Sequence, residues 1–290
     1  MFWQTSRYRI DLGRPRVMGI VNITPDSFTD GGQYLDASAA LGRCEQLLSQ
    51  GADLLDLGAE STRPGAHPLS AQEELIRLLP VLQGALQLGV PVSVDTYKPE
   101  VMQVVLDMGA DIINDIWALR WLAPEPPAAA LSGLAVVAAH PNCGVCLMHM
   151  HREPQTMQTA PMEGDAVPQV AQFLVKAAQD LEAAGVDGAR ICLDYGIGFG
   201  KTVAQNFALL ARQRELLDHG YPLLAGWSRK SSLAAAAALG DASRVTVSVA
   251  AAVFAADRGA RVLRVHDVKD TVQALAVWAA MRAQDHTTDT

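Results

Sequence analysis

Charged residues are scarce in this sequence. Only 19% of the 290 residues are Asp, Glu, Lys or Arg, half of the residues are hydrophobic, and the formal net charge is −8. A net negative charge argues against a surface for nucleic acid or for an anionic membrane, because both favour Lys and Arg. An anionic substrate would therefore need positive side chains that are gathered at one place in the fold.

Cysteines and long apolar runs are scarce as well. The chain has four cysteines in 290 residues, which is too few for a disulfide framework. No segment approaches the roughly 18 consecutive apolar residues of a membrane span. Polar and charged residues occur throughout residues 1–16, which therefore lack the apolar core of a signal peptide. We therefore expect a cytoplasmic protein, without a membrane or nucleic-acid partner, whose cysteines stay reduced.

One unit repeats along the chain: a short apolar run, a polar loop and an amphipathic stretch. The runs mostly follow one another at spacings of about 32–45 residues, the length of a βα unit. Each run is continuously apolar, which is typical of a strand buried on both faces. The eight runs are Val17–Val21, Asp53–Leu57, Pro91–Val94, Asp111–Ile113, Val145–Met148, Arg190–Leu193, Pro222–Ala225 and Arg261–Val265.

Polar residues favour one of the two folds that eight βα units allow. In a closed barrel the C-terminal ends of all strands meet on one face, whereas an open sheet would place its polar residues at one or two strands. Nearly every run carries a polar residue at or just past that end: Asn22, Asp56, Asp95, Asn114, His149, Asp194, Lys230 and Arg264. The sequence therefore predicts a (β/α)8 TIM barrel, a single α/β domain over residues 1–290 with its core at about 17–280.

Local signals add detail to this fold. Arg7–Asp11 and Arg16–Gly19 flank the turn residues 13–15 and predict a short N-terminal hairpin at the bottom of the barrel. Ser70 with Glu73 fits a capping box at the start of a helix. Alanine-rich segments predict two further helices, over Leu233–Leu239 and Val245–Ala256.

Eight short motifs occur in one order between residues 17 and 268, each at the end of a predicted strand. They occupy residues 22–32 (NITPDSFTDGG), 60–65 (ESTRPG), 94–98 (VDTYK), 113–115 (IND), 147–150 (LMHM), 196–201 (GIGFGK), 228–231 (SRKS) and 264–267 (RVHD). Together they resemble the signatures of the dihydropteroate synthases, a family of pterin-binding barrel enzymes. Each motif alone is weak evidence, but eight in the family order are highly specific.

The resemblance implies a transferase of folate biosynthesis. Such an enzyme joins 6-hydroxymethyl-7,8-dihydropterin pyrophosphate to para-aminobenzoate, and it releases 7,8-dihydropteroate and pyrophosphate. The electron-rich pterin ring stabilises a cation once pyrophosphate departs, so catalysis rests on positioning and electrostatics rather than on a nucleophilic side chain. The resemblance also implies Mg2+ as cofactor, a homodimer and a sulfonamide target.

The candidate pterin site lies at the ends of three predicted strands. Asp95, Asn114 and Asp194 can match the N–H groups of a pterin, and carboxylates and amides from three strands can converge on one ring. In the family the matching residues hold the pterin, with Lys230 and Met148 at the ring. Asp56 is a further candidate substrate-binding residue. The candidate catalytic residues are Asp95, Asn114, Asp194, Lys230 and Arg264.

The candidate anion and arylamine sites lie beside it. Arg264 and His266 follow the last predicted strand, where barrels commonly bind phosphate. Arginine's planar fork suits phosphate oxygens. The resemblance places Asn22 on both the pyrophosphate and the Mg2+ ion. The remaining candidate substrate-binding residues are Asp26, Asp30, Thr62 and Arg63 for the pyrophosphate with its Mg2+, and Phe28, Arg63, Pro64, Phe199 and Ser231, with Lys230, for para-aminobenzoate.

Three other patterns invite different functions. The stretch 196–202 lacks the first glycine of a phosphate-binding P-loop, because Tyr195 stands there. A zinc site among His140, Cys143, Cys146, His149 and His151 is disfavoured, since six extended residues place Cys143 and His149 about 20 Å apart. Trp117, Trp121 and Trp227 suggest an aromatic cage, although packing in the core or in a loop is the commoner role of tryptophan.

Departures from the family pattern keep two alternatives open. Ser232-Leu233-Ala234 replaces the usual Phe-Ile-Gly, Tyr195 replaces a proline, and Ile116-Trp117-Ala118 stands where small residues are usual. We interpret these changes as touching the arylamine end and the pocket floor. A non-catalytic pterin-binding paralogue would bind the substrate and form no product. A pterin-dependent methyltransferase would share the pterin carboxylates but would not need Arg63, Arg264 and His266.

Overall fold

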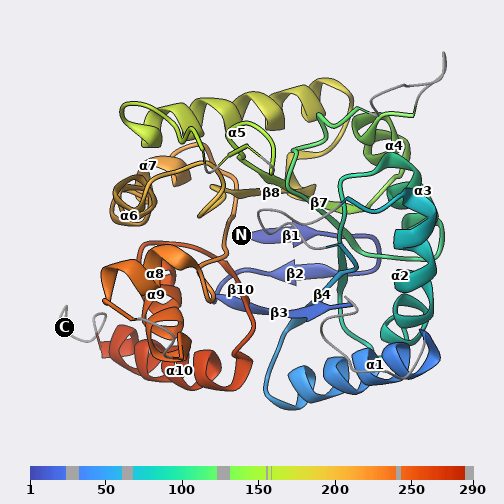
Figure 1. The fold of residues 1–290 in the computed structure, drawn as a ribbon, viewed down its shortest axis with the longest axis horizontal. Helices are drawn as coiled ribbons and strands as arrows, with labels where there is room; N and C mark the ends of the chain where they lie inside the picture. Colours follow the sequence, from blue (N-terminus) through green and yellow to red (C-terminus); the bar gives the residue numbers. More distant parts are fainter. Residues whose placement is uncertain are drawn as a thin grey trace.

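A closed barrel of parallel strands forms the centre of the molecule (Figure 1). The computed structural model describes residues 1–23, 33–60, 68–122, 131–154, 156–157, 159–239 and 243–284. Neighbouring strands follow the chain order, and the last strand pairs with the first, which closes the barrel. The strands are β3 (Arg16–Asn22), β4 (Leu54–Gly58), β5 (Val92–Asp95), β6 (Ile112–Asp115), β7 (Gly144–Met148), β8 (Ile191–Asp194), β9 (Leu223–Ala225) and β10 (Val262–Val265). The predicted TIM barrel is confirmed.

Helices surround the barrel on its outside (Figure 1). The capping box is present, since Glu73 N donates to Ser70 Oγ at 3.2 Å and Ser70 N donates to Glu73 Oε2 at 2.8 Å. The helix expected from Leu233 begins two residues earlier, at Ser231. The helices are α1 (Gln33–Ser49), α2 (Ala71–Ala85), α3 (Pro99–Asp107), α4 (Gly133–Ala139), α5 (Ala166–Ala183), α6 (Val203–Ala211), α7 (Arg214–Leu217), α8 (Ser231–Ala236), α9 (Val245–Asp257) and α10 (Val268–Gln284).

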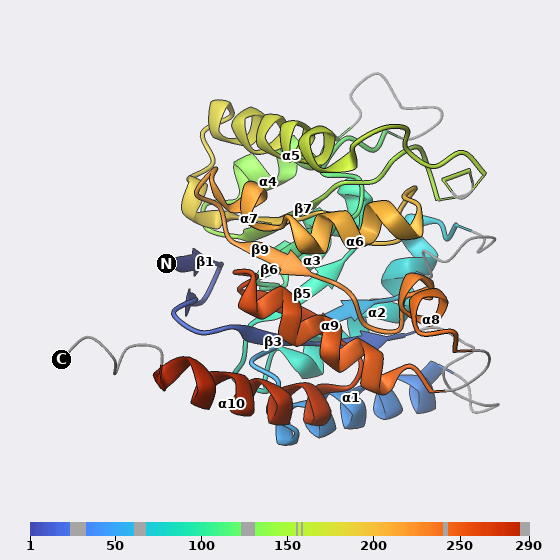
Figure 2. The same ribbon diagram turned by 90° about the vertical axis from the view of Figure 1, so that its left-hand side faces the viewer.

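The N-terminal hairpin exists, but its predicted pairing is wrong. Antiparallel pairing joins β1 (Phe2–Gln4) to β2 (Arg9–Asp11), whereas Arg16 begins the first barrel strand. The reason is the composition of that strand: its central residues are apolar and buried, and the strand bonds β4 and β10 on its two edges. Figure 2 shows β1 at one end of the molecule, with α8 toward the other.

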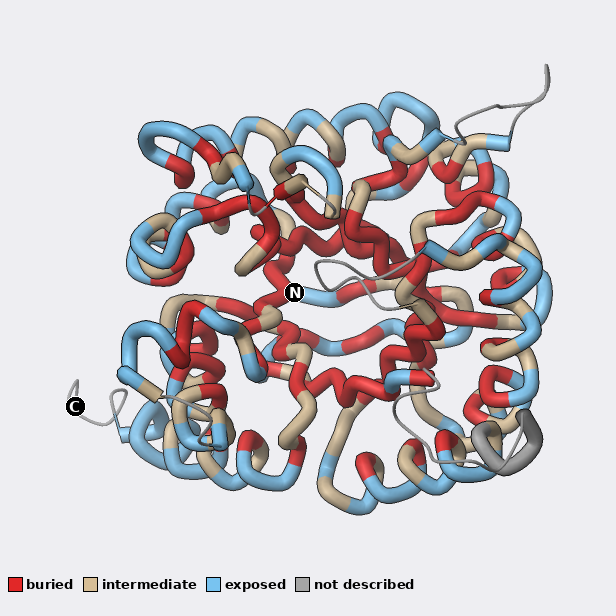
Figure 3. The backbone as a smooth tube through the Cα atoms, in the orientation of Figure 1, coloured by how far each residue is buried: buried red, intermediate tan, exposed pale blue. Residues whose placement is uncertain are grey.

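The hairpin is fastened to the barrel bottom by a buried tryptophan. Trp3 has no exposed surface, and its Nε1 donates to the carbonyl of Arg190 at 2.9 Å. Trp3, Ile10 and Leu12 pack against apolar residues from the lower ends of the barrel strands. A second and larger apolar cluster lies between the strands and the helices. In Figure 3 the buried residues, in red, follow the barrel strands and the inward sides of the surrounding helices. No helix among the described ranges is long and apolar enough to cross a membrane.

Candidate active site

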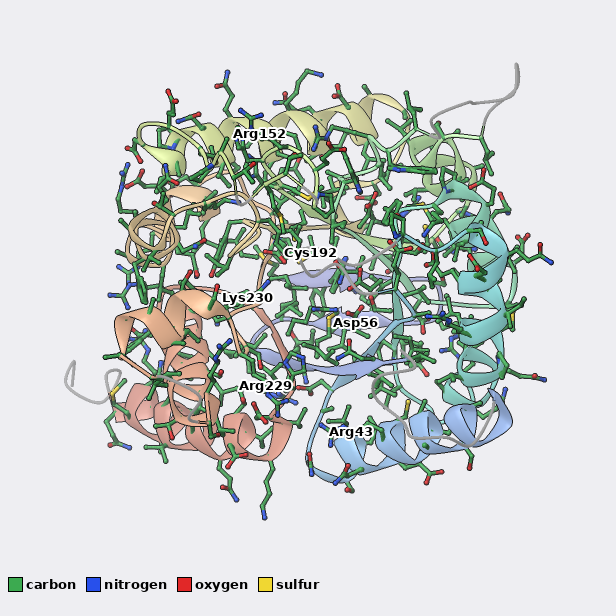
Figure 4. All side chains as sticks on the ribbon, in the orientation of Figure 1. Arg43, Asp56, Arg152, Cys192, Arg229 and Lys230 are labelled. Carbon is green, nitrogen blue, oxygen red and sulfur yellow. The ribbon has the colours of Figure 1, made fainter. Side chains whose placement is uncertain are left out.

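An arginine bound by two aspartates lies at the top of the barrel. Arg264 on β10 donates from Nε to Asp56 Oδ2 on β4 and from Nη2 to Asp95 Oδ2 on β5, both at 2.6 Å. The side chain of Asp56 is fully buried, while those of Asp95 and Arg264 keep 18% and 23% of their surface. Asp56 lies near the middle of the barrel in Figure 4. The sequence placed these residues at three separate strand ends, and the fold brings them into contact.

Asn114 joins the same cluster from β6. Its Nδ2 lies 3.4 Å from both carboxylate oxygens of Asp56. Asp56 therefore supports Arg264 and Asn114 from below, whereas Asp95 and Asn114 are adjacent in register on neighbouring strands. Burial raises the pKa of Asp95 to about 7, and the Arg264 charge opposes that rise.

Asp194 and Lys230 form the opposite side of the cluster. Asp194 Oδ1 accepts from Gly196 N at 2.7 Å, and burial raises the pKa of Asp194. Burial lowers the pKa of Lys230 to about 8, while the nearby Asp194 charge opposes the decrease. Because a carboxylate and an ammonium group face one space in a low-dielectric setting, this end of the barrel can bind a polar ring by its donors and acceptors.

An apolar wall stands beside these charges. Met148 and Phe199 belong to one buried cluster with Ile116, Met150 and Met157. The Lys230 ammonium lies 4.5 Å from the centre of the Phe199 ring, within the range of a cation–π contact. A flat aromatic ligand can therefore contact an apolar surface while its edge meets the charged cluster.

His266 is held in place by its neighbours. Its Nδ1 lies 2.9 Å from Ser228 Oγ, its backbone N donates to the same oxygen at 3.1 Å, and its carbonyl accepts from Arg43 Nη2 at 2.9 Å. Burial lowers the pKa of His266 to about 3, and the Arg264 charge adds to the decrease. The imidazole is thus neutral at physiological pH, and within the described part of the chain Nε2 has no hydrogen-bond partner, so it can bind a ligand.

Some of the other candidate residues lie among the described residues and some do not. Asn22 ends β3 with an exposed side chain, and Ser231 begins α8 directly after Lys230. Six candidates lie outside the described residues: Asp26, Phe28, Asp30, Thr62, Arg63 and Pro64. Within the described ranges no group of three or more His, Cys, Asp or Glu side chains is arranged to hold a metal ion.

One of the family departures lies where the sequence did not place it. Tyr195 points away from the pocket: its hydroxyl donates to Gln213 Oε1 at 2.9 Å and accepts from Trp227 Nε1 at 3.1 Å, between barrel and helices. The interpretation that it touches the pocket is wrong. Tyr195 directly follows Asp194, the last residue of β8, and successive residues of an extended chain face opposite sides. Ser232 is buried, and its hydroxyl accepts from Asn206 Nδ2 at 2.9 Å.

Trp117, another departure from the family pattern, lies beside the pocket as expected. It packs at the edge of the apolar wall, and its ring centre lies 6.5 Å from that of Tyr97. Tyr97 also meets Trp121 edge to face, at 5.3 Å. Trp227, by contrast, is buried against Phe207 on α6.

His149 also departs from the strand-end pattern. It follows β7, but its ring stacks edge to face on Phe173 of α5, at 4.9 Å, on the outside of the barrel. At the other end of β7, Cys143 lies 3.1 Å from Arg190 Nη2. Cys146 lies in the middle of β7, so the candidate zinc ligands are distributed along the strand and do not gather at one point.

Two buried lysines were missed by the sequence reasoning. Lys98 Nζ donates to Glu60 Oε2 at 2.5 Å and to Glu74 Oε2 at 2.6 Å. Lys201 Nζ contacts three backbone carbonyls beside the pocket. Both lysines stand in the quoted motifs, but a lysine in sequence looks the same whether it is exposed or buried.

Comparison with known proteins agrees with this geometry. Residues 18–266 match the family model described as "Pterin binding enzyme". The dihydropteroate synthase of Neisseria meningitidis serogroup B is 45% identical, over 96% of this chain and 97% of the relative. The chain belongs to the dihydropteroate synthase family. Members of this family are transferases, so the protein is an enzyme of that class.

Two solved structures of the same family superpose closely on the fold. Xanthomonas albilineans dihydropteroate synthase with 4-aminobenzoic acid is 44% identical, with a TM-score of 0.87 over 98% of this chain and 99% of that one. Burkholderia cenocepacia dihydropteroate synthase complexed with 7,8-dihydropteroate is 45% identical, with a TM-score of 0.85 over 99% and 98%. This dihydropteroate synthase fold therefore carries the charged cluster at the end of the barrel where barrel enzymes bind their substrates.

Proposed function

We propose that the protein joins 6-hydroxymethyl-7,8-dihydropterin pyrophosphate to para-aminobenzoate and forms 7,8-dihydropteroate and pyrophosphate. The observation that carries the proposal is the contact of Arg264 with Asp56 and Asp95, beside Asn114 and facing Asp194. Acceptors that match a pterin edge and a cation that matches a pyrophosphate then lie side by side. The Xanthomonas albilineans structure holds 4-aminobenzoic acid, and the Burkholderia cenocepacia structure holds 7,8-dihydropteroate.

The pterin lies on the carboxylates in this proposal. Asp95 and Asp194 accept from the ring N–H groups, and Asn114 supplies both a donor and an acceptor. Asp56 keeps Arg264 and Asn114 in place from below, since both of its oxygens are occupied by them. Met148 and Lys230 border the ring.

Arg264 and His266 bind the pyrophosphate. Among the described residues Arg264 Nη1 has no hydrogen-bond partner, so its donors remain available to a phosphate oxygen. His266 offers Nε2 because Ser228 occupies Nδ1. These donors stabilise the charge that develops as the bond from the pterin methylene carbon to the pyrophosphate oxygen breaks. The arylamine nitrogen then forms the new C–N bond and releases a proton.

Mg2+ fits this arrangement as a partner of the pyrophosphate. The ion usually keeps several waters and binds to one or two protein oxygens plus phosphate oxygens, and the exposed amide of Asn22 at the end of β3 is one such ligand. Bound there, Mg2+ would supply further neutralisation of the leaving pyrophosphate. Asp26, Asp30, Thr62 and Arg63 are proposed at the same anion.

The para-aminobenzoate ring lies against Phe199 and Lys230 in this proposal. Ser231 follows Lys230 at the start of α8 and is placed near the carboxylate, and Phe28, Arg63 and Pro64 complete the site. Sulfonamides copy the aniline ring and the acidic group of para-aminobenzoate, so we expect them to compete with it.

A second copy of the chain covers the outer face of α9 and α10. Phe254, Val277 and Met281 are large apolar residues on these helices with 54%, 73% and 54% of their surface exposed. Apolar side chains gathered on neighbouring helices are typical of a subunit interface. We therefore propose a homodimer through these helices, and a cytoplasmic location for the enzyme.

One incubation tests the proposed reaction. The protein is mixed with the pterin pyrophosphate, para-aminobenzoate and Mg2+, and dihydropteroate and free pyrophosphate are measured together. Equal amounts of the two products are expected. Binding of the pterin pyrophosphate without product would instead identify a non-catalytic paralogue. Arg264→Met serves as the control, because it removes the group that binds both the carboxylates and the anion.

A further inference from the structure

Lys201 lies behind the pocket wall with almost no contact with water. Only 4% of its surface is exposed, and its ammonium donates to the carbonyls of His149 at 3.2 Å, Gly196 at 2.8 Å and Phe199 at 3.2 Å. A lysine ammonium has three N–H donors, whereas the neutral amine has two. The three carbonyls therefore require the protonated form, although burial lowers the pKa of Lys201 to about 7.

The loop that Lys201 holds has an unusual backbone. Gly196, Gly198 and Gly200 have φ angles of +64°, +82° and +70°, a region that side chains disfavour. A Cβ at Gly196 would lie 2.0 Å from the carbonyl oxygen of His149. This conformation turns carbonyls inward, where a buried acceptor without a donor is costly. The ammonium of Lys201 satisfies them.

Asn206 on α6 holds the same loop from the other side. Its Oδ1 accepts from Gly198 N at 3.0 Å, and its Nδ2 donates to Ser232 Oγ at 2.9 Å and to the Lys201 carbonyl at 3.4 Å. Asn206 is 1% exposed. One side chain thus joins the loop after β8 to the start of α8, which directly follows Lys230.

Held in this way, the loop brings its residues against Lys230. The Phe199 ring lies 4.5 Å from Lys230 Nζ, and a Cβ on Gly198 would lie 3.5 Å from Lys230 Cδ. We infer that Lys201 and Asn206 are positioning residues that fix the Phe199–Lys230 wall and thereby set the affinity for the arylamine. This inference rests on the proposed placement of para-aminobenzoate against that wall.

The test separates the two substrates. Lys201→Met keeps the length of the side chain and removes its three donors. We expect the KM for para-aminobenzoate to rise about tenfold or more, while kcat and the KM for the pterin pyrophosphate stay within about threefold. Asn206→Ser, which loses the reach to Gly198, is expected to shift the same KM in the same direction. This second variant decides the matter if Lys201→Met does not fold.

Two controls make the result specific. Val170→Ala opens a cavity at a fully buried position on α5, and it shows whether lost stability alone changes the KM. Phe199→Ala removes the wall itself. Unchanged affinity in Phe199→Ala would overturn the proposed arylamine site. A shift in Phe199→Ala with normal affinity in the folded Lys201→Met and Asn206→Ser variants would overturn only the positioning role. The positioning role would also be overturned if Lys201→Met raised the KM for both substrates equally, or if Val170→Ala raised the KM for para-aminobenzoate by the same factor.

Discussion

The two ends of the barrel interior are built from the same strands and have opposite chemistry. At the bottom, the inward residues include Leu54, Ile112, Cys192 and Val262, which pack with Trp3. Two residues further along each strand, on the same face, stand Asp56, Asn114, Asp194 and Arg264. The bottom excludes water and fixes the strands, so the top can hold charges in fixed positions without weakening the fold.

The charges at the top depend on one another, whereas the apolar contacts at the bottom are largely independent. Arg264 contacts two carboxylates, and each carboxylate would be left unpaired without it. A change at the top should therefore spread through the cluster, while a change at the bottom should cost stability alone. Four measurements test this difference.

Replacement of Arg264 should have the largest effect. Arg264→Met leaves Asp56 and Asp95 facing each other without a cation, so we expect a loss of about 3–5 kcal/mol in the free energy of unfolding. The affinity for the pterin pyrophosphate should fall by about 1.5–3 kcal/mol more than the affinity for a pterin without pyrophosphate. Denaturation and calorimetry check the two quantities. The double variant Arg264→Met/Asp56→Asn should regain part of the lost free energy of unfolding but no activity. If it regained activity as well, Arg264 would not be part of the anion site.

A cavity at the bottom should cost stability and spare the chemistry. Trp3→Ala removes a fully buried side chain and its hydrogen bond to Arg190, and we expect a loss of about 3–5 kcal/mol in the free energy of unfolding. The kcat/KM per folded molecule at low temperature should stay unchanged. A clear change in that ratio would mean that the packing at the bottom of the barrel also controls the chemistry at the top.

Asp95→Asn should act on the ligand more than on the fold. The amide keeps the shape of the carboxylate but offers one acceptor and two donors to the pterin, so affinity for the pterin should fall about tenfold or more. We expect a stability change well below that of Arg264→Met, since Asp56 still pairs with the arginine. Normal pterin binding by a folded Asp95→Asn protein would exclude β5 from the pocket.

The pH dependence of pterin binding should be modest and bell-shaped. Asp95, whose pKa is raised to about 7, accepts hydrogen bonds with both oxygens only when ionised, because protonation turns one oxygen into a donor. The affinity for the pterin should therefore decrease below pH 7. Lys230, whose pKa is lowered to about 8, is charged only at lower pH, so affinity should also decrease above pH 8. Titrations with 6-hydroxymethyl-7,8-dihydropterin avoid the titration of the pyrophosphate. Lys230→Arg should remove the decrease in affinity above pH 8. If the decrease persists in this variant, a group other than Lys230 causes it.

Much of the candidate site could be predicted from the sequence, because the strand ends of a barrel converge on one face whatever the conformation of the loops. Asp95, Asn114, Asp194 and Arg264 follow from that rule and from the motifs. His149 did not follow it, since a residue just past a strand can turn outward, as its contact with Phe173 shows. The predicted hairpin pairing was wrong because only the turn residues between Arg7–Asp11 and Arg16–Gly19 were considered. The second segment belongs to a longer apolar strand that bonds two barrel neighbours.

The sequence by itself determined the number of βα units, the barrel and the chemical types of the residues at its strand ends. These depend on periodicity and on local backbone preferences, which are properties of short stretches of chain. Only the tertiary structure decided which charges meet, which lysines are buried and which backbone carbonyls they satisfy. Lys201 shows why. Its partners, His149, Gly196 and Phe199, come from two different strand–loop junctions, and burial, which raises the cost of an unpaired charge or carbonyl, exists only once the chain has folded.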